Sequence, residues 1–278
     1  MQKSLFLICF LFLGLATFQS CQKDADTNLT KTEQTTAEDI LAQNDLTEMA
    51  DAEIDDAIPD DLVGGSADDR GGCATITYAQ PKGTWPNTIT IDYGNGCTQP
   101  GGITFKGKII VKQSAKMTTA GATRQITYEN FYVENVKIEG SRTVTNAGLN
   151  AAGQPVFTKT GTETLTFPDG DTATRTINHV RTMTEGYNTN IRADNVWQIT
   201  GTDTGVNRNG DAFTVTIKTA LTKKFTCPWL ISGVIELTVN GKTRSLDFGD
   251  GTCEREATLT LADGTEKEIK IRRRWWKF

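Results

Sequence analysis

Residues 234–246 read VIELTVNGKTRSL, and this stretch decides the fold class. Apolar and polar residues alternate around Asn240-Gly241, as they do in antiparallel strands with one buried and one solvated face. Asn-Gly between alternating runs is typical of a two-residue β-turn, because both positions tolerate a positive φ. The stretch therefore predicts a β-hairpin.

The same alternation recurs along most of the chain after Gly72, and Thr, Val and Ile dominate it. The other runs are TITIDY (88–93), KIIVKQ (108–113), QITYENFYV (125–133), TETLTF (162–167), FTVTI (213–217) and ATLTL (257–261). Turns are also predicted at Pro168-Asp169-Gly170, Asn209-Gly210 and Asp263-Gly264. We expect 71–278 to be an all-β region, with an internal duplication described below. Its predicted fold is an antiparallel meander of roughly 12–14 strands with long hairpins, forming a large curved sheet or a sandwich.

The first 20 residues are organised like a signal peptide. Lys3 precedes the apolar run Leu5–Phe18, which is shorter than the ~18–20 residues of a membrane-spanning helix. Ser20, a small residue, then precedes Cys21, as at the cleavage site of bacterial lipoproteins, whose cysteine receives a diacylglycerol. We expect residues 1–20 to be removed and Cys21 to carry the lipid, including palmitate. The alternative is an ordinary secretory peptide in which Cys21 is incidental.

The segment 21–70 differs from the rest of the chain in charge. Residues 22–70 hold 15 acidic and three basic residues, a net charge of −12, whereas 71–278 hold 25 basic and 19 acidic residues, a net charge of +6. The acidic segment lacks aromatic residues, which predicts a disordered or weakly helical tether. A helix is most strongly indicated at 37–57, and two readings stay open. It is either a transient helix on a solvated tether or a helix whose acidic face docks on the basic domain.

Four cysteines follow the segment that contains the lipid site, and they lie in two similar places. Cys73 is followed by NTITIDYGNGC ending at Cys97, and Cys227 is followed by KTRSLDFGDGTC ending at Cys253. Four cysteines allow three pairings. The similarity of the two segments favours Cys73–Cys97 and Cys227–Cys253, with one disulfide in each copy of a duplicated β unit. A Cys₄ zinc site is the rival reading, although no Cys-x₂-Cys spacing is present.

The two similar segments also share a short acidic turn motif. Asp92 and Asn95 occur in the first copy, and Asp247 and Asp250 occur in the second. The plain reading is a tight turn after a strand, in which glycine supplies a positive φ and the acidic or amide residue caps the turn. The same oxygen ligands make these four residues a weak calcium candidate.

Several of these segments together resemble a group of all-β lipoproteins of the Bacteroidota. The segments are IDYGNGC, FKGKIIV (105–111), NFYVENVKIEGSRTVTN (130–146), TFPDG (166–170), WQITGTDTGVNRNG (197–210), CPWLISGVIEL (227–237) and LDFGDGTC. The resemblance implies a place in the cell envelope and one continuous β unit, and it implies no catalytic residue. The segment 22–26 also loosely resembles a surface-display signal. We therefore expect a protein anchored by lipid in the outer membrane and exposed on the cell surface.

Catalytic motifs are scarce in this sequence. His179 is the single histidine, which excludes zinc hydrolase motifs that need two, and no Gly-x-Ser-x-Gly or nucleotide-binding loop occurs. No enzyme activity, metal or cofactor is expected. A carboxylate-dependent hydrolase stays open as an alternative, because it needs only Asp and Glu.

The C-terminal segment combines positive charge with aromatic rings. Its possible ligand-facing residues are Arg272, Arg273, Arg274, Trp275 and Trp276. The plain reading is a final strand with packed Trp and solvated Arg, and a third reading is docking on the acidic tether. The expected partners are the membrane, through the lipid, and a glycan or an envelope protein, with no nucleic acid. A surface binding or structural module is therefore the leading hypothesis, and a periplasm-facing lipid carrier or assembly factor is its alternative.

Overall fold

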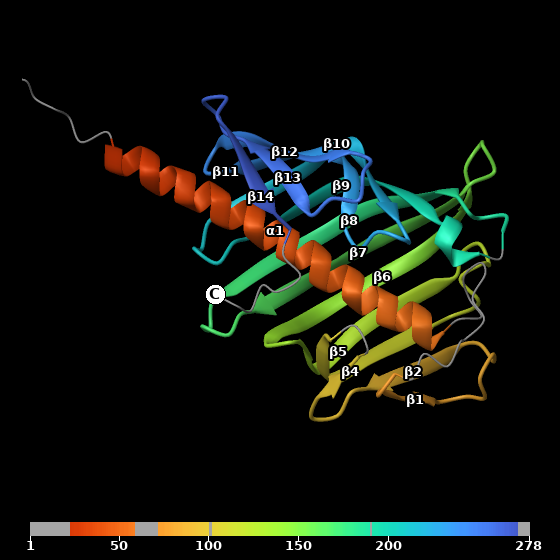
Figure 1. Cartoon of the computed structure of the whole chain (residues 1–278). Coiled ribbons are helices and arrows are strands. Elements are labelled where there is room, and N and C mark those ends of the chain that lie inside the picture. The colour runs from red at the N-terminus through yellow and green to blue at the C-terminus, as the bar shows by residue number, and fades with distance from the viewer. Residues whose placement is uncertain (1–22, 59–71, 100–101, 190, 272–278) are drawn as a thin grey trace, which may run out of the picture.

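The computed structural model describes residues 23–58, 72–99, 102–189 and 191–271, and it describes the side chains of the helix from Thr35 onward. The described chain is all-β apart from one long helix and one short 3₁₀ turn, as the alternation predicted (Figure 1). The helices are α1 (Lys23–Ala57) and η2 (Arg192–Asp194). The strands are β1 (Thr75–Tyr78), β2 (Asn87–Asp92), β3 (Cys97–Thr98), β4 (Thr104–Gln113), β5 (Thr123–Val133), β6 (Val136–Leu149), β7 (Pro155–Thr166), β8 (Thr172–Glu185), β9 (Val196–Val206), β10 (Ala212–Lys224), β11 (Leu230–Val239), β12 (Lys242–Asp250), β13 (Glu256–Thr260) and β14 (Glu266–Lys270).

The strands form one 14-stranded sheet, in which each strand from β4 onward pairs with its neighbours in the sequence. Every pairing is antiparallel, and β3 alone lies off the main path, beside β4. The predicted meander with long hairpins is therefore confirmed, as a curved sheet. Because the sheet is continuous, the described part of 71–278 forms a single structural unit.

The predicted turns lie where the hairpins reverse. Asn240 and Gly241 both have a positive φ, of 49° and 72°, and they connect β11 directly to β12. Two successive positive φ values match the right-handed twist of the flanking strands, which explains the Asn-Gly pair. The turns after β7, β9 and β13 also contain a positive-φ glycine, at Gly170, Gly210 and Gly264.

Helix α1 lies across the concave face of the sheet, and β11–β14 curl over it on one side (Figure 1). The expected helix at 37–57 falls within α1. Apolar residues of α1 share one hydrophobic core with inward residues from both ends of the sheet; on the helix they are Ala37, Ile40, Leu41, Ala42, Leu46, Ala50, Ile54 and Ala57. Within the part of the chain that the structure describes, no helix is both apolar enough and long enough to span a membrane.

Candidate functional site

Among the described residues, most of the buried charges lie at the interface between α1 and the sheet. Acidic residues of α1 face basic residues that point inward from β5 to β8. Of the two readings of this segment, the docked helix is therefore the one that the structure contains. The charge asymmetry of the sequence has a structural basis here, because the acidic segment lies against the basic domain.

Arg142 of β6 is at the centre of this interface, and its side chain is fully buried. Its guanidinium donates hydrogen bonds to Asp51 of α1, to Glu163 of β7 and to the hydroxyl of Tyr128. Lys159 of β7 approaches the second oxygen of Asp51 at 2.8 Å. Two cations and two carboxylates thus neutralise one another away from water, which is the condition under which buried charge is tolerated.

A second group of charges lies beside the first, toward β9. Arg175 of β8 donates to the side chain of Asn44 on α1 and lies 3.8 Å from Asp203. His179 Nε2 lies 2.9 Å from the other oxygen of Asp203. The single histidine is therefore paired with a buried carboxylate inside the sheet. It has a structural partner there, as the plain reading of a strand histidine implies.

Glycines face these long side chains across the sheet. Arg142 is opposite Gly161, Arg175 is opposite Gly205, and Glu163 is opposite Gly140. A Cβ at Gly161 would lie 2.7 Å from the Cβ of Arg142, closer than real Cβ contacts. The glycines therefore leave room for guanidinium and carboxylate groups between the sheet and α1.

Further ion pairs follow α1 toward both of its ends. They join Asp39 to Arg208 at 2.6 Å, Asp55 to Arg124 at 2.9 Å and Asp56 to Arg192 at 2.8 Å. Thr36 and Asn207, which are 171 positions apart in the sequence, are also hydrogen-bonded, at 2.6 Å. These polar contacts recur along the described helix, so they specify its position along the groove as well as its rotation.

The environment shifts the pKa values of the acids in two directions. Burial alone would raise the pKa of Asp51, but Arg142, Lys159 and Arg181 outweigh it and hold that pKa well below its ordinary value. The pKa of Glu163 is lowered in the same way, mainly by Arg142 and Arg175 against the effect of burial. Burial dominates at Asp39 and raises its pKa. The acids over the middle of the sheet are therefore held ionised by neighbouring cations.

A cleft of about 480 Å³ opens beside α1, on the side of η2 and the β10–β11 connection. The guanidinium of Arg181 lies 5.3 Å from the ring of Trp197, and that of Arg192 lies 4.8 Å from the ring of Phe225. Glu48 and Asp51 of α1 lie 3.4 and 3.8 Å from Arg181. The cleft thus combines aromatic faces with both signs of charge.

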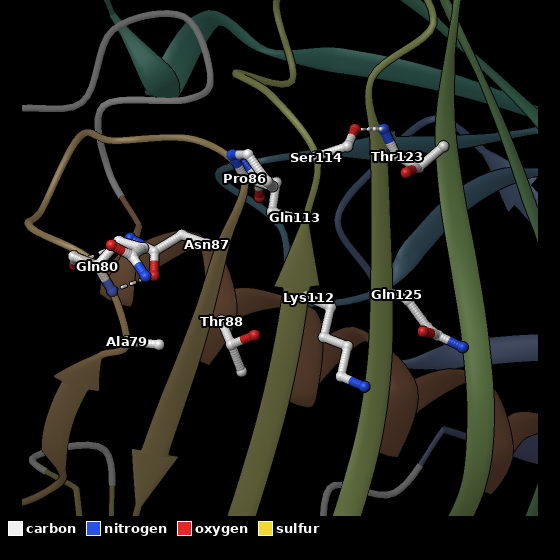
Figure 2. Close-up of a pocket in the computed structure, with 10 residues that line it drawn as sticks. All are labelled: Ala79, Gln80, Pro86, Asn87, Thr88, Lys112, Gln113, Ser114, Thr123 and Gln125. Atoms are coloured by element: carbon white, nitrogen blue, oxygen red, sulfur yellow. Dashed lines mark hydrogen bonds between the residues drawn. The ribbon is translucent and has the colours of Figure 1, made fainter.

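A second depression, of about 400 Å³, lies on the sheet near the end of β1 (Figure 2). Thr88, Lys112 and Gln125 lie side by side there on β2, β4 and β5. The side chain of Asn87 bonds to the main chain of Gln80, so it shapes the loop. Hydroxyl, amide and ammonium groups of this kind suit a polar ligand, but no buried group converges on a single point.

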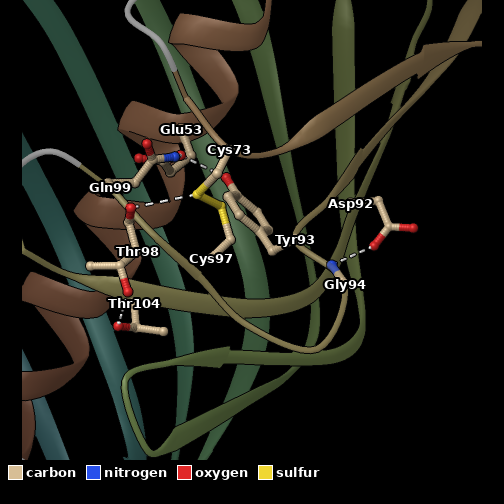
Figure 3. The surroundings of a disulfide bond; sticks show 9 residues. All are labelled: Glu53, Cys73, Asp92, Tyr93, Gly94, Cys97, Thr98, Gln99 and Thr104. Atoms are coloured by element: carbon tan, nitrogen blue, oxygen red, sulfur yellow. Dashed lines mark hydrogen bonds between the residues drawn. A yellow bond between two sulfur atoms is a disulfide. The ribbon is translucent and has the colours of Figure 1, made fainter.

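Both predicted disulfides are present, which confirms the pairing that the sequence echo favoured. Cys73–Cys97 and Cys227–Cys253 each have a Cα–Cα distance of 5.7 Å. In each copy the first cysteine precedes one strand of a hairpin, β1 or β11, and the second follows the other strand, β2 or β12. The two copies therefore close their hairpins in the same way. Figure 3 shows the first disulfide beside Tyr93, whose hydroxyl donates to Glu53 of α1 at 2.7 Å.

The acidic turn motifs have the geometry of capped turns. Asp92 accepts a hydrogen bond from the Gly94 main chain, and Asp247 accepts one from Gly249. Asp250 accepts from both the main chain and the hydroxyl of Thr252. Asn95 is exposed in the first turn. Within the described ranges, no group of three potential ligands could hold a metal ion, and calcium binding stays a prediction.

The other predicted residues are divided between the described and undescribed parts of the chain. Cys21 and the C-terminal group Arg272, Arg273, Arg274, Trp275 and Trp276 lie outside the described residues. Trp85, Trp197 and Trp229 are each half-buried. The first and third pack against the main core, and Trp197 packs edge-on against Phe157 with ring centroids 5.6 Å apart. All three rings are therefore partly engaged in packing, and Trp197 also lies beneath Arg181 in the cleft.

Sequence reasoning did not identify the cations of the concave face as a group. Arg142, Lys159 and Arg175 occur in Thr-rich strands whose two faces are both polar, so alternation does not mark the buried face. One feature of the sequence could have indicated them: the net charge of 71–278 is positive, whereas that of 22–70 is negative. A second signal is the glycine that interrupts each neighbouring strand.

Comparisons with known proteins add no relative. No protein-family model matches the sequence, no curated protein matches it, and no solved structure matches the fold. The resemblance to Bacteroidota lipoproteins therefore stays a prediction.

Proposed function

We propose that this chain is a lipid-anchored protein of the outer membrane that acts as a non-catalytic binding or structural module on the cell surface. The observation that carries the proposal is the continuity of α1. The helix begins at Lys23, two residues after Cys21, and runs unbroken into the core of the domain. A lipid on Cys21 would thus be joined to the sheet by a helix.

The helix would set the distance between the anchor and the sheet. The residues of α1 before Thr35 extend over about 18 Å at the helical rise per residue. In Figure 1 the first turns of α1 extend beyond the sheet. A helical stalk that is anchored in the core would present the β domain in a fixed orientation, which suits a module that displays a surface to a partner.

The buried charges support a structural role for this interface. The carboxylates of Asp51 and Glu163 are paired with cations, and their pKa values are lowered. A general acid needs a raised pKa, so these two acids are poorly matched to the acid role in glycoside hydrolysis. The pKa of Asp39 is raised, but its carboxylate is fully buried and both of its oxygens accept hydrogen bonds from Arg208. A lipid carrier would need an open apolar cavity, but α1 occupies the apolar concave face. No specific contact favours either alternative over a binding or structural module.

The anchor is tested by replacing Cys21 with Ser in the full chain. We expect the variant to leave the membrane fraction for the soluble fraction, while the parent stays in the membranes and partitions into detergent. Cys9→Ser is the matched control, because Cys9 lies in the apolar part of the signal peptide and should be removed with it. Equal membrane association of the Cys21→Ser variant and the parent would contradict the anchor.

The orientation needs a separate measurement. Protease added to intact cells should remove the β domain if it faces outward, while a periplasmic control protein survives. Protection of the domain until the outer membrane is opened would contradict surface display. That result would be compatible with the lipid anchor, and it would mean that the module faces the periplasm.

A further inference from the structure

The cleft beside α1 has the size of a small-molecule site. Its volume is about 480 Å³, and proteins bind small ligands in pockets of roughly 300–1,000 Å³. It is lined by residues of α1, β8, β9, η2 and the β10–β11 connection. Five segments that are far apart in the sequence thus contribute side chains to one space.

The wall formed by the β10–β11 connection is held in place by several contacts. Cys227 lines the cleft and is joined to Cys253 by a disulfide. The main-chain N–H of Phe225 donates to the main-chain oxygen of Asn195 at 3.0 Å, which ties this wall to the end of η2. The ammonium group of Lys223 donates to the main-chain oxygen of Cys227 at 2.7 Å. A wall that is ordered before binding loses little conformational entropy when a ligand arrives.

Arg181 and Glu48 line this cleft with hydrogen-bonding capacity that the protein does not use. Nη1 of Arg181 lies 3.4 Å from Oε1 of Glu48, which is longer than the ~2.7–2.9 Å of a charge-assisted hydrogen bond. Within the described ranges neither side chain makes a hydrogen bond, and Nε of Arg181 is buried without a partner. Polar groups in such a position ordinarily bind water or a ligand.

A hydroxyl group suits this pair of side chains. It can accept a hydrogen bond from Arg181 and donate one to Glu48 at the same time, whereas a carboxylate can only accept and an ammonium can only donate. The neighbouring acids Asp55 and Asp56 already lie 2.9 and 2.8 Å from basic side chains. A ligand with a net charge would disturb this balance of charges, and a neutral ligand would leave it intact.

The cleft also offers an apolar surface beside its polar groups. Phe225 lines the cleft and is 42% exposed, and Met49 and Trp197 line it as well. Sugars combine hydroxyl groups with apolar C–H faces on one ring. The lining of the cleft matches both parts of such a molecule.

We propose that the cleft binds a neutral sugar residue of a glycan, with one hydroxyl held between Arg181 and Glu48 and a C–H face packed on Phe225. This inference rests on the proposed binding module and names its ligand class. The lipid on Cys21 takes no part in the contact. The membrane fractionation of Cys21→Ser and the glycan measurements below can therefore fail independently.

Binding of the full chain, in mild detergent, to immobilised glycans is the first test. The array carries neutral oligosaccharides of glucose, galactose and mannose beside sialylated and glucosamine oligosaccharides, which are negatively and positively charged. At least one neutral oligosaccharide should bind roughly tenfold more strongly than any charged one, because a charge would be left uncompensated in the cleft. Absence of binding to every neutral oligosaccharide, or stronger binding of a charged one, would overturn the proposal.

Titration with the strongest neutral oligosaccharide then locates the site. Glu48→Gln should weaken binding by roughly tenfold, because it replaces an ionised acceptor by a neutral one. Phe225→Ala should weaken binding by a similar factor, because it removes the apolar surface. Both side chains are partly exposed, so both variants should keep the urea midpoint of the parent.

Two control variants belong to the same titration. Glu236→Gln makes the same change on the convex face, and Lys112→Ala alters the second depression. Both should bind like the parent. Parent-like affinity of Glu48→Gln and Phe225→Ala, or loss of binding in Lys112→Ala instead, would show that the sugar does not occupy the cleft.

Discussion

The concave face is built from two kinds of strand. The central strands, β6–β8, direct Arg142, Lys159, Glu163 and Arg175 toward α1, and these residues are buried. The flanking strands, β2–β5 and β10–β13, direct mainly aliphatic and aromatic residues toward the same helix. Apolar contacts are non-directional, whereas charges require a specific partner. The flanking strands therefore supply most of the apolar contact with α1. The central strands determine the position of α1 along the concave face of the sheet.

Loss of a central cation should have the largest effect. Arg142→Leu leaves Asp51 and Glu163 buried without their main partner, so we expect the free energy of unfolding to fall by about 3–5 kcal/mol. Urea denaturation followed by circular dichroism measures the change. Thr143→Ala, on the neighbouring position and the opposite face, should change it by less than about 0.5 kcal/mol. A loss below about 1 kcal/mol for Arg142→Leu would remove the distinction between the two kinds of strand.

Loss of an apolar contact between α1 and the flanking strands should lower the free energy of unfolding by a nearly equal amount. Leu46 is fully buried in the core shared by α1 and the sheet, so Leu46→Ala should cost roughly 2–5 kcal/mol. Ala52→Ser, on the exposed side of α1, is the matched control in the same denaturation experiment. If the two variants were equally stable, α1 would not depend on its apolar face.

The pH dependence of stability separates two kinds of acid on α1. The lowered pKa of Asp51 means that its contribution is present above the unfolded pKa of about 4 and is lost as the pH falls. The raised pKa of Asp39 has the opposite sign, so its contribution is present at low pH and is lost as the pH rises through the folded pKa.

Stability curves between about pH 6 and pH 3 should therefore diverge for the two amide variants. Asp51→Asn should make the free energy of unfolding fall less steeply toward low pH than in the parent. Asp39→Asn should make it fall more steeply. Parallel curves for both variants and the parent would contradict the assigned pKa directions.

Substitution of a charged residue on the convex face should have the smallest effect on the free energy of unfolding. Lys218 and Glu236 form an exposed ion pair there, with a distance of 3.3 Å. Exposed pairs contribute little because water and salt screen them, so Lys218→Ala should cost less than about 1 kcal/mol. A larger loss in the same urea experiment would mean that charge matters as much outside the groove as within it.

The sequence predicted the strands well because each flanking strand alternates between polar and apolar residues. VIELTV and TITIDY show their buried face directly, and the Asn240-Gly241 turn sets the register of its hairpin. The disulfides were predictable because the two copies repeat the same motif with similar cysteine separations, of 24 and 26 positions. In the central strands, a buried Arg175 sits among threonines that face solvent, so no periodicity separates the two faces.

The position of α1 was predictable only as one of two alternatives. Charge complementarity favoured docking, but the tether composition favoured a solvated chain. What decides between them is the match between individual partners, such as Thr47 with Glu163, which are 116 positions apart in the sequence. Local patterns contain no information about pairs at such a separation. The cation groups of the groove become recognisable only when the sheet is assembled.

The burial of α1 also has a consequence for the order of events during synthesis. The helix leaves the ribosome before any strand, yet the core that it joins includes residues as late as Leu259 and Ile271. Contacts between segments so far apart in the chain form slowly, because a long loop must close first. The helix is therefore among the first segments to be made, and its burial is complete only when the last hairpin has arrived. A chain interrupted before β13 would leave the core around α1 incomplete, so folding cannot finish before the C-terminal hairpin has been made.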